Sequence, residues 1–145
     1  MIVNKLAKEI YDNAVAHGFD DNTVQIRGAL VKADAHNDLI GAFNNMVISQ
    51  RIALIHSELS EAREALRKGK FADISLAYEQ CQRTDGELCE VCFEQYIKNT
   101  FEDEIADVII RSLELCAMMS IDIDKHIELK MKYNANRPNK HGKLF

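Results

Sequence analysis

The sequence has few residues that break helices: one proline, Pro138, and six glycines among 145 residues. A sandwich of many short strands needs a turn about every eight to twelve residues, so this architecture is excluded. A few long helices are favoured instead. The length is typical of a single domain, and we predict one all-α domain over residues 1–145.

The sequence also lacks an excess of positive charge, because 18 basic residues stand against 23 acidic ones and the net charge is -5. Proteins that wrap a nucleic-acid backbone usually carry the opposite excess, so we expect no nucleic-acid partner. A small phosphorylated ligand remains compatible with this charge. The apolar runs are too short to cross a membrane, and the charged first ten residues do not resemble a signal peptide. We therefore expect a cytoplasmic protein without a membrane partner.

Apolar residues recur at helical spacing along most of the chain. Gly18 and Gly69 are candidate helix stops, and Asn37 or Asp38 is a candidate cap for the helix that follows. The prediction is an antiparallel helical bundle with no sheet. Its helices are expected over residues 2–17, 24–36, 39–68, 100–119 and 121–134, with a helical insert at about 70–99 that turns at Asp85-Gly86 and an extended tail over 135–145.

Two glutamates interrupt an otherwise apolar pattern in residues 51–67. The expected core face of this helix consists of Ile52, Ile55, Leu59, Ala62 and Leu66. Glu58 and Glu61 lie on the adjacent stripe, between Leu54 and Ala65, and are one turn apart. Their positions are compatible with two solvated acids on the surface. They are equally compatible with an acidic pair at the edge of the core. At the core edge a divalent cation would remove their repulsion and desolvation cost.

A second acidic pair, Glu104 and Asp107, shares one face of a later helix, beside an expected core of Ile105, Val108, Ile109 and Leu113. Acids at a helix start are favoured by the dipole, but Asp107 lies in the second turn. If the two helices pack antiparallel, four carboxylates converge, and such oxygen ligands suit Mg²⁺ or Mn²⁺. A di-iron bundle would need Glu-x-x-His motifs, and the sequence contains none.

The concentrated positive charge lies near the C-terminus, where Lys130, Asn134 and Arg137 recur at spacings of four and three. The helix dipole accounts for lysines at the helix end. It does not account for the basic residues that continue beyond that end, Arg137, Lys140 and Lys143. Beside a carboxylate cluster, such a tail is what a polyphosphate ligand would need.

Three segments in this order resemble the MazG-like all-α nucleoside triphosphate pyrophosphohydrolases. They are the stretch from His56 to Arg67, the motif Glu104-Ile-Ala-Asp107, and the series Lys130, Asn134 and Arg137-Pro-Asn-Lys-His-Gly-Lys. The resemblance covers both ends of the chain and most of the middle. It departs from the family in one place, because the 42 residues between Glu61 and Glu104 are more than the family's usual interval.

The resemblance implies a Mg²⁺-dependent split of a (deoxy)nucleoside triphosphate into the monophosphate and pyrophosphate. The catalytic metal ligands would be Glu58, Glu61, Glu104 and Asp107. Lys130 and Arg137 would hold phosphates, with Asn134 near them or near the sugar. Members of the family generally assemble, so a homodimer or homotetramer is implied. Two alternatives remain open: a catalytically silent helical interaction protein on the same scaffold, and a phosphoribosyl-ATP pyrophosphohydrolase.

Three of the four cysteines, Cys81, Cys89 and Cys92, fall in the insert, and Cys116 lies in an apolar helix. Cys89-x-x-Cys92 is a lone pair, whereas a structural zinc site needs four ligands. Cys81 could supply a third ligand, and no fourth is evident nearby. Buried free thiols are therefore the expectation.

Overall fold

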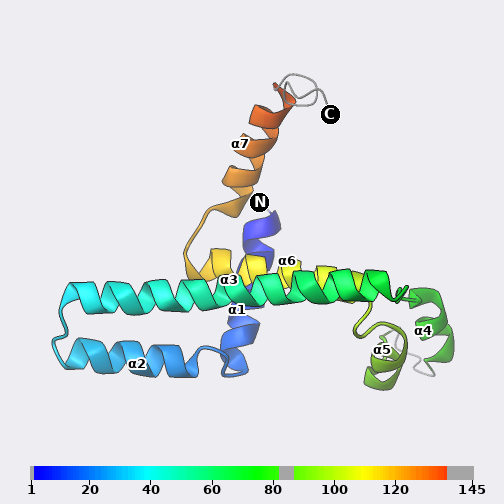
Figure 1. Ribbon diagram of the computed structural model, residues 1–145, viewed down its shortest axis with the longest axis horizontal. Coiled ribbons are helices and arrows are strands. Elements are labelled where there is room, and N and C mark those ends of the chain that lie inside the picture. Colours follow the sequence, from blue (N-terminus) through cyan, green and yellow to red (C-terminus); the bar gives the residue numbers. More distant parts are fainter. Residues whose placement is uncertain (1, 82–86, 137–145) are drawn as a thin grey trace. The chain divides into compact units, whose positions relative to one another are not determined.

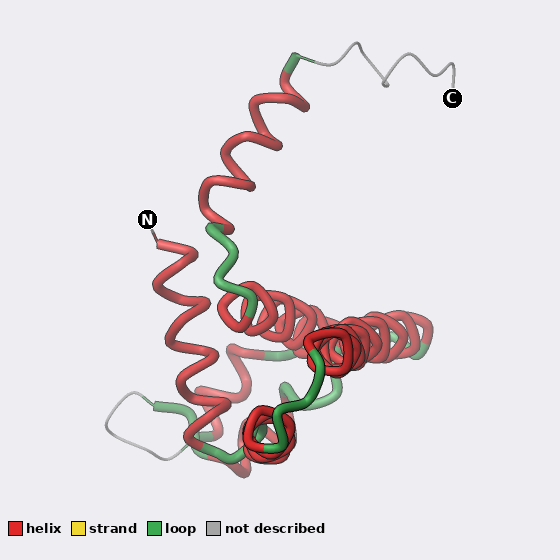
Figure 2. The backbone as a smooth tube through the Cα atoms, turned by 90° about the vertical axis from the view of Figure 1, so that its left-hand side faces the viewer, coloured by secondary structure: helices red, strands yellow, loops and turns green. Residues whose placement is uncertain are grey.

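The computed structural model describes residues 2–81 and 87–136, which form seven helices and no strand, so the predicted all-α class is confirmed. Figure 2 shows only helices and loops over these residues. The helices are α1 (Ile2–Ala16), α2 (Asp21–Lys32), α3 (Asn37–Arg67), α4 (Ile74–Gln80), α5 (Glu90–Tyr96), α6 (Phe101–Met118) and α7 (Ile123–Ala135) (Figure 1). None of these helices combines the length and the apolar character that crossing a membrane requires.

Two glycines follow helix ends as predicted. Gly18 and Gly69 have φ values of 80° and 64°, a region that glycine adopts without steric cost. The predicted cap of α3 was wrong, because His36 is the capping residue and its Nδ1 accepts the backbone N–H of Asp38 at 3.3 Å. The helix α2 begins at Asp21, earlier than expected, and its dipole favours an acid in that turn. The predicted turn at Asp85-Gly86 and the tail from Arg137 lie outside the described residues.

The chain divides into two compact units. One unit contains the residues up to Asp21 together with those from Leu113 onward. The other unit is continuous from Asn22 to Ser112. The two acidic motifs both belong to the continuous unit.

In the continuous unit, α3 lies beside α2 and beside the first part of α6 (Figure 1). The Arg27 guanidinium of α2 donates to the Asn44 side-chain oxygen of α3 at 2.8 Å. The helices α3 and α6 are antiparallel. Glu58 of α3 pairs with Arg111 of α6. Just beyond the end of α3, the Lys70 carbonyl accepts the N–H of Phe101, at the start of α6, at 3.0 Å.

The expected core face of α3 was only partly correct, because Ala62 is buried and Ile55 is half-buried. The buried residues of α3 are Val47, Glu58, Ala62 and Ala65, whereas Ile52, Leu59 and Leu66 are 43%, 45% and 51% exposed. One face of α3 carries Glu58, Ala62 and Ala65. The helix α6 covers this face, because its Arg111 pairs with Glu58. On α6, the expected core residue Leu113 is buried, whereas Ile109 is exposed.

The insert forms two short helices, as predicted, and α4 packs against α5. The Asp73 side chain caps α4 by accepting the N–H of Leu76 at 2.9 Å, and the Asp73 N–H donates to the Tyr96 carbonyl at 3.2 Å. The rings of Phe71 and Phe101 meet edge to face, 6.2 Å apart. The hydrogen bonds of Asp73 join parts of the insert to each other, and the ring contact joins the start of the insert to α6.

In the other unit, the first turns of α1 and α7 cap each other. The backbone N–H groups of Val3 and Asn4 donate to the Asp124 carboxylate at 3.3 and 2.9 Å. In return the Asp124 N–H donates to the Asn4 side-chain oxygen at 3.2 Å. Each helix start thus supplies the acceptor that the other helix lacks.

Candidate metal centre

Three carboxylates from α3 and α6 come together in the continuous unit. One oxygen from each of Glu58, Glu61 and Glu104 lies within 4.8 Å of the other two. Glu58 and Glu104 are buried, at 7% and 5% exposure, and Glu61 is exposed. The spacing of three on α3 brings the first two acids to one side, and the antiparallel α6 brings the third.

Two neighbours orient these carboxylates. The Arg111 Nε donates to the Glu58 Oε1 at 2.5 Å, and the Arg111 side chain is 34% exposed. The Ser57 hydroxyl donates to the Glu61 Oε1 at 3.2 Å. A charged partner thus holds the buried Glu58 in place, and one guanidinium offsets only part of the charge of three carboxylates.

The local environment opposes ionisation of Glu104. Burial raises the pKa of this carboxyl above its usual value, and the nearby charges of Glu61 and Glu58 raise it further. Both effects disfavour the charged form, and a bound cation would oppose both. The arrangement is therefore suited to holding a positive ion.

Asp107 lies one turn further along α6 and is half-buried. It is not part of the group of three oxygens that lie within 4.8 Å of one another. Burial raises its pKa, as do the charges of Asp103 and Glu58, while Arg111 lowers it. The structure therefore brings together three of the four acids that the motifs singled out, with the fourth nearby on the same helix.

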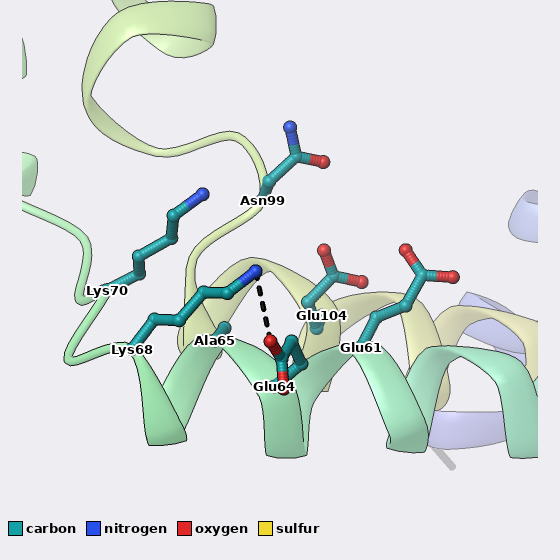
Figure 3. A pocket seen from close by; sticks show the side chains of 7 residues that line it. All are labelled: Glu61, Glu64, Ala65, Lys68, Lys70, Asn99 and Glu104. Atoms are coloured by element: carbon teal, nitrogen blue, oxygen red, sulfur yellow. Dashed lines mark ion pairs between the residues drawn. The ribbon is translucent and has the colours of Figure 1, made fainter.

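A pocket of roughly 220 Å³ lies beside the carboxylates. In Figure 3 the carboxylates of Glu61 and Glu104 lie next to each other, and the amino groups of Lys68 and Lys70 extend to the same side. The pocket is lined by Glu61, Glu64, Ala65, Lys68, Lys70, Asn99 and Glu104. The Lys68 Nζ lies 3.0 Å from the Glu64 Oε1. Cationic and anionic groups thus share one opening.

Backbone contacts fix the wall of this pocket. The Ala72 N–H donates to the Glu102 carboxylate at 2.9 Å, which holds the segment after Lys70 against α6. Thr100 caps α6, because its hydroxyl accepts the Asp103 N–H at 3.4 Å. The Asp103 carboxylate accepts the Asn99 N–H at 2.9 Å.

Sequence reasoning missed the pocket residues Lys68, Lys70 and Asn99. The motif Lys-Gly-Lys directly follows the helix that carries Glu58 and Glu61. Basic residues at the end of a helix are also favoured by the helix dipole, so the motif alone does not indicate a pocket. The expected phosphate residues Lys130 and Asn134 are exposed on α7, in the other unit. The Lys130 ammonium lies 5.3 Å from the ring centroid of Tyr133. Arg137 lies outside the described residues.

No protein-family model, curated protein or solved structure matches this chain.

Proposed function

We propose that the protein is a Mg²⁺-dependent hydrolase that splits a (deoxy)nucleoside triphosphate into the monophosphate and pyrophosphate, as its MazG-like motifs imply. The observation that carries this proposal is the meeting of Glu58, Glu61 and Glu104 on two antiparallel helices. These acids come from two of the three segments that carry the resemblance. Two of them, Glu58 and Glu104, are buried, and buried carboxylates are rare without a partner. Arg111 is the cationic partner of Glu58, whereas Glu104 faces the charges of Glu61 and Glu58.

The donors fit the proposed ion. All three are carboxylate oxygens, which suit the hard cations Mg²⁺ and Mn²⁺. The raised pKa of Glu104 reflects burial and an excess of negative charge that a divalent cation would offset. Asp107, on the same helix, would be the fourth acid of the centre.

The residues of the chain have separate tasks in this proposal. Glu58, Glu61 and Glu104 hold the ion, and Arg111 keeps the Glu58 carboxylate in position. When bound, Mg²⁺ would offset negative charge on the phosphate oxygens during the reaction. Lys68 and Lys70 offer point charges to phosphate oxygens beside the carboxylates. From the motifs alone, Lys130 and Arg137 are further phosphate contacts, and Asn134 contacts the phosphates or the sugar.

We also propose that the enzyme works as a homodimer or homotetramer in the cytoplasm. The exposed apolar stripe of Ile52, Leu59 and Leu66 on α3 supports an assembly, because such a stripe marks a contact surface. Light scattering of the purified protein measures the mass directly, and a monomer would contradict this part of the proposal.

The test is pyrophosphate release from the eight common nucleoside triphosphates and from phosphoribosyl-ATP, with Mg²⁺, with Mn²⁺ and with a chelator. We expect turnover of at least one nucleoside triphosphate that needs the metal. Release from phosphoribosyl-ATP alone would favour that alternative enzyme, and no release from any compound would favour a silent scaffold protein.

The matched variants are Glu61→Gln and Glu9→Gln. Both remove one exposed carboxylate, and Glu9 lies on α1 in the other unit. Glu61→Gln should lower turnover by at least about 100-fold, because a metal supplies several kcal/mol of charge stabilisation. Its helical content by circular dichroism should stay unchanged. Equal activity of the two variants would show that Glu61 is not a ligand.

A further inference from the structure

The three cysteines of the insert meet at one point. The sulfur atoms of Cys81, Cys89 and Cys92 all lie within 4.8 Å of one another. Cys81 directly follows the end of α4, Cys89 directly precedes α5, and Cys92 lies in the first turn of α5. Only Cys92 is buried, and the other two are half-buried, so the expectation of buried free thiols was only partly correct.

This spacing is close to that of a metal–thiolate site. Sulfurs bound tetrahedrally at about 2.3 Å from a zinc ion stand about 3.8 Å apart. The observed separations therefore need to shrink by about 1 Å at most, which side-chain rotation can supply. The same three side chains come from two elements, so a bound ion would join α4 to α5.

Hydrogen bonds hold the three cysteines beside one another. The Cys89 N–H donates to the Cys81 sulfur at 3.1 Å. Backbone and side-chain hydrogen bonds from Cys92 lower the pKa of Cys89, and the hydrogen bond to Cys89 together with burial raises the pKa of Cys92 to about 11. The opposite directions of these two shifts reflect the hydrogen bond between the Cys89 and Cys92 side chains.

Over its described residues, the insert buries few side chains. Its helices α4 and α5 have seven residues each, too few to be stable alone. Each buries one residue, Ala77 in α4 and Cys92 in α5. The larger side chains Ile74, Tyr78 and Val91 are 56%, 52% and 69% exposed. Small units with so small a core are commonly stabilised by a structural metal.

We propose that Cys81, Cys89 and Cys92 bind one Zn²⁺ through three thiolates, that water completes the tetrahedron, and that this ion fastens α4 to α5. Binding releases the thiol protons to solvent. Thiolates select Zn²⁺ over Mg²⁺. The oxygen ligands of Glu58, Glu61 and Glu104 instead suit Mg²⁺. The proposal does not depend on the proposed hydrolase activity.

The first experiment measures zinc by mass spectrometry in protein purified without chelator. We expect about one Zn²⁺ per chain in the wild type and in Cys116→Ser, whose cysteine lies outside the cluster. Cys89→Ser should lose the ion. Cys89→His should keep it, because imidazole is also a zinc ligand. Equal zinc in wild type and Cys89→Ser, or equal loss in Cys116→Ser, would overturn the site.

The second experiment needs no substitution, so misfolding of a variant cannot decide the outcome. The reduced wild-type protein is stripped of metal and titrated with Co²⁺. We expect thiolate-to-cobalt charge-transfer bands and the intense visible bands of a tetrahedral ion, saturating at about one equivalent, with no change in excess Mg²⁺. Absence of the charge-transfer bands would overturn the proposal.

X-ray absorption at the zinc edge tests the ligand set. We expect three sulfur ligands at about 2.3 Å and one oxygen. Four sulfurs would place the ion between copies of the chain and overturn the single-chain site. A disulfide between two of the three cysteines in zinc-supplied, reduced protein would do the same.

Discussion

Replacing Glu104 with glutamine should stabilise the protein in the absence of divalent cations. Its carboxylate lies within 4.8 Å of those of Glu58 and Glu61. At this distance, two unit charges repel by about 0.9 kcal/mol in water and about 3.5 kcal/mol at an effective dielectric constant of 20. Since Glu61 is exposed and Arg111 offsets Glu58, we expect a net gain of about 1–2 kcal/mol for Glu104→Gln.

The assay is thermal or urea unfolding of both proteins, with chelator and with Mg²⁺. For a chain of this size, 1 kcal/mol corresponds to roughly 2–4 °C in melting temperature. The order of the two melting temperatures should reverse when Mg²⁺ is added. At 100 times its Kd, Mg²⁺ stabilises the wild type by about 2.7 kcal/mol and the variant by less.

Two results would refute this reasoning. If Glu104→Gln melts earlier than wild type in chelator, the three carboxylates do not repel one another as the geometry indicates. If both proteins gain equally from Mg²⁺, Glu104 does not hold the ion. Glu9→Gln, whose acid lies in the other unit, should match the wild type under both conditions.

Three further outcomes are expected. The pKa values of Glu104 and Asp107 are raised in the folded protein, so their contribution to metal-free stability falls as pH rises through the interval between their usual and raised values. The melting-temperature gain from Mg²⁺ should therefore be larger at about pH 7.5 than at about pH 4.5; an equal gain at both pH values would argue against binding by these acids. Arg111→Met should cost about 3 kcal/mol in urea unfolding, because it leaves the buried Glu58 carboxylate without its cation; addition of Glu58→Gln should restore most of that loss, and no restoration would mean that Arg111 acts elsewhere. Arg137→Ala should weaken nucleotide binding by about 1.5–3 kcal/mol in a titration, with little change in the ligand-free melt; early melting with normal binding would make Arg137 structural.

The helices were predictable because their signals are local. The periodicity and the stops at Gly18 and Gly69 depend on neighbouring residues only, and the structure confirms both stops. The buried face of α3 was not predictable in the same way. Apolar content pointed to a stripe of which Ala62 is buried but Ile52, Leu59 and Leu66 are exposed. The helix α6 instead covers the face with Glu58, Ala62 and Ala65. Which face a helix buries depends on its partner, and Arg111 is 53 positions away from Glu58.

The acids of the candidate site were predictable for a related reason. Carboxylates in an otherwise apolar pattern are rare enough to be noticed in a sequence. Lys68 and Lys70 were not, because lysines at a helix end are ordinary. Both lysines line the pocket, and the Lys70 carbonyl accepts the N–H of Phe101, a contact between the two ends of the insert. The meeting of Cys81 with Cys89 and Cys92 likewise depends on how α4 packs against α5.

The mutual capping of α1 and α7 has a consequence for the order of folding. Asn4 and Asp124 are 120 positions apart, so the start of α1 leaves the ribosome long before its acceptor is made. The continuous unit from Asn22 to Ser112 has no such delay. During synthesis we expect that unit to form first. The hydrogen bonds between α1 and α7 should form later, because α7 is made last and closing the long loop between them costs entropy. Pulse-labelled hydrogen exchange should therefore protect the amides of Val3 and Asn4 later than those of α3.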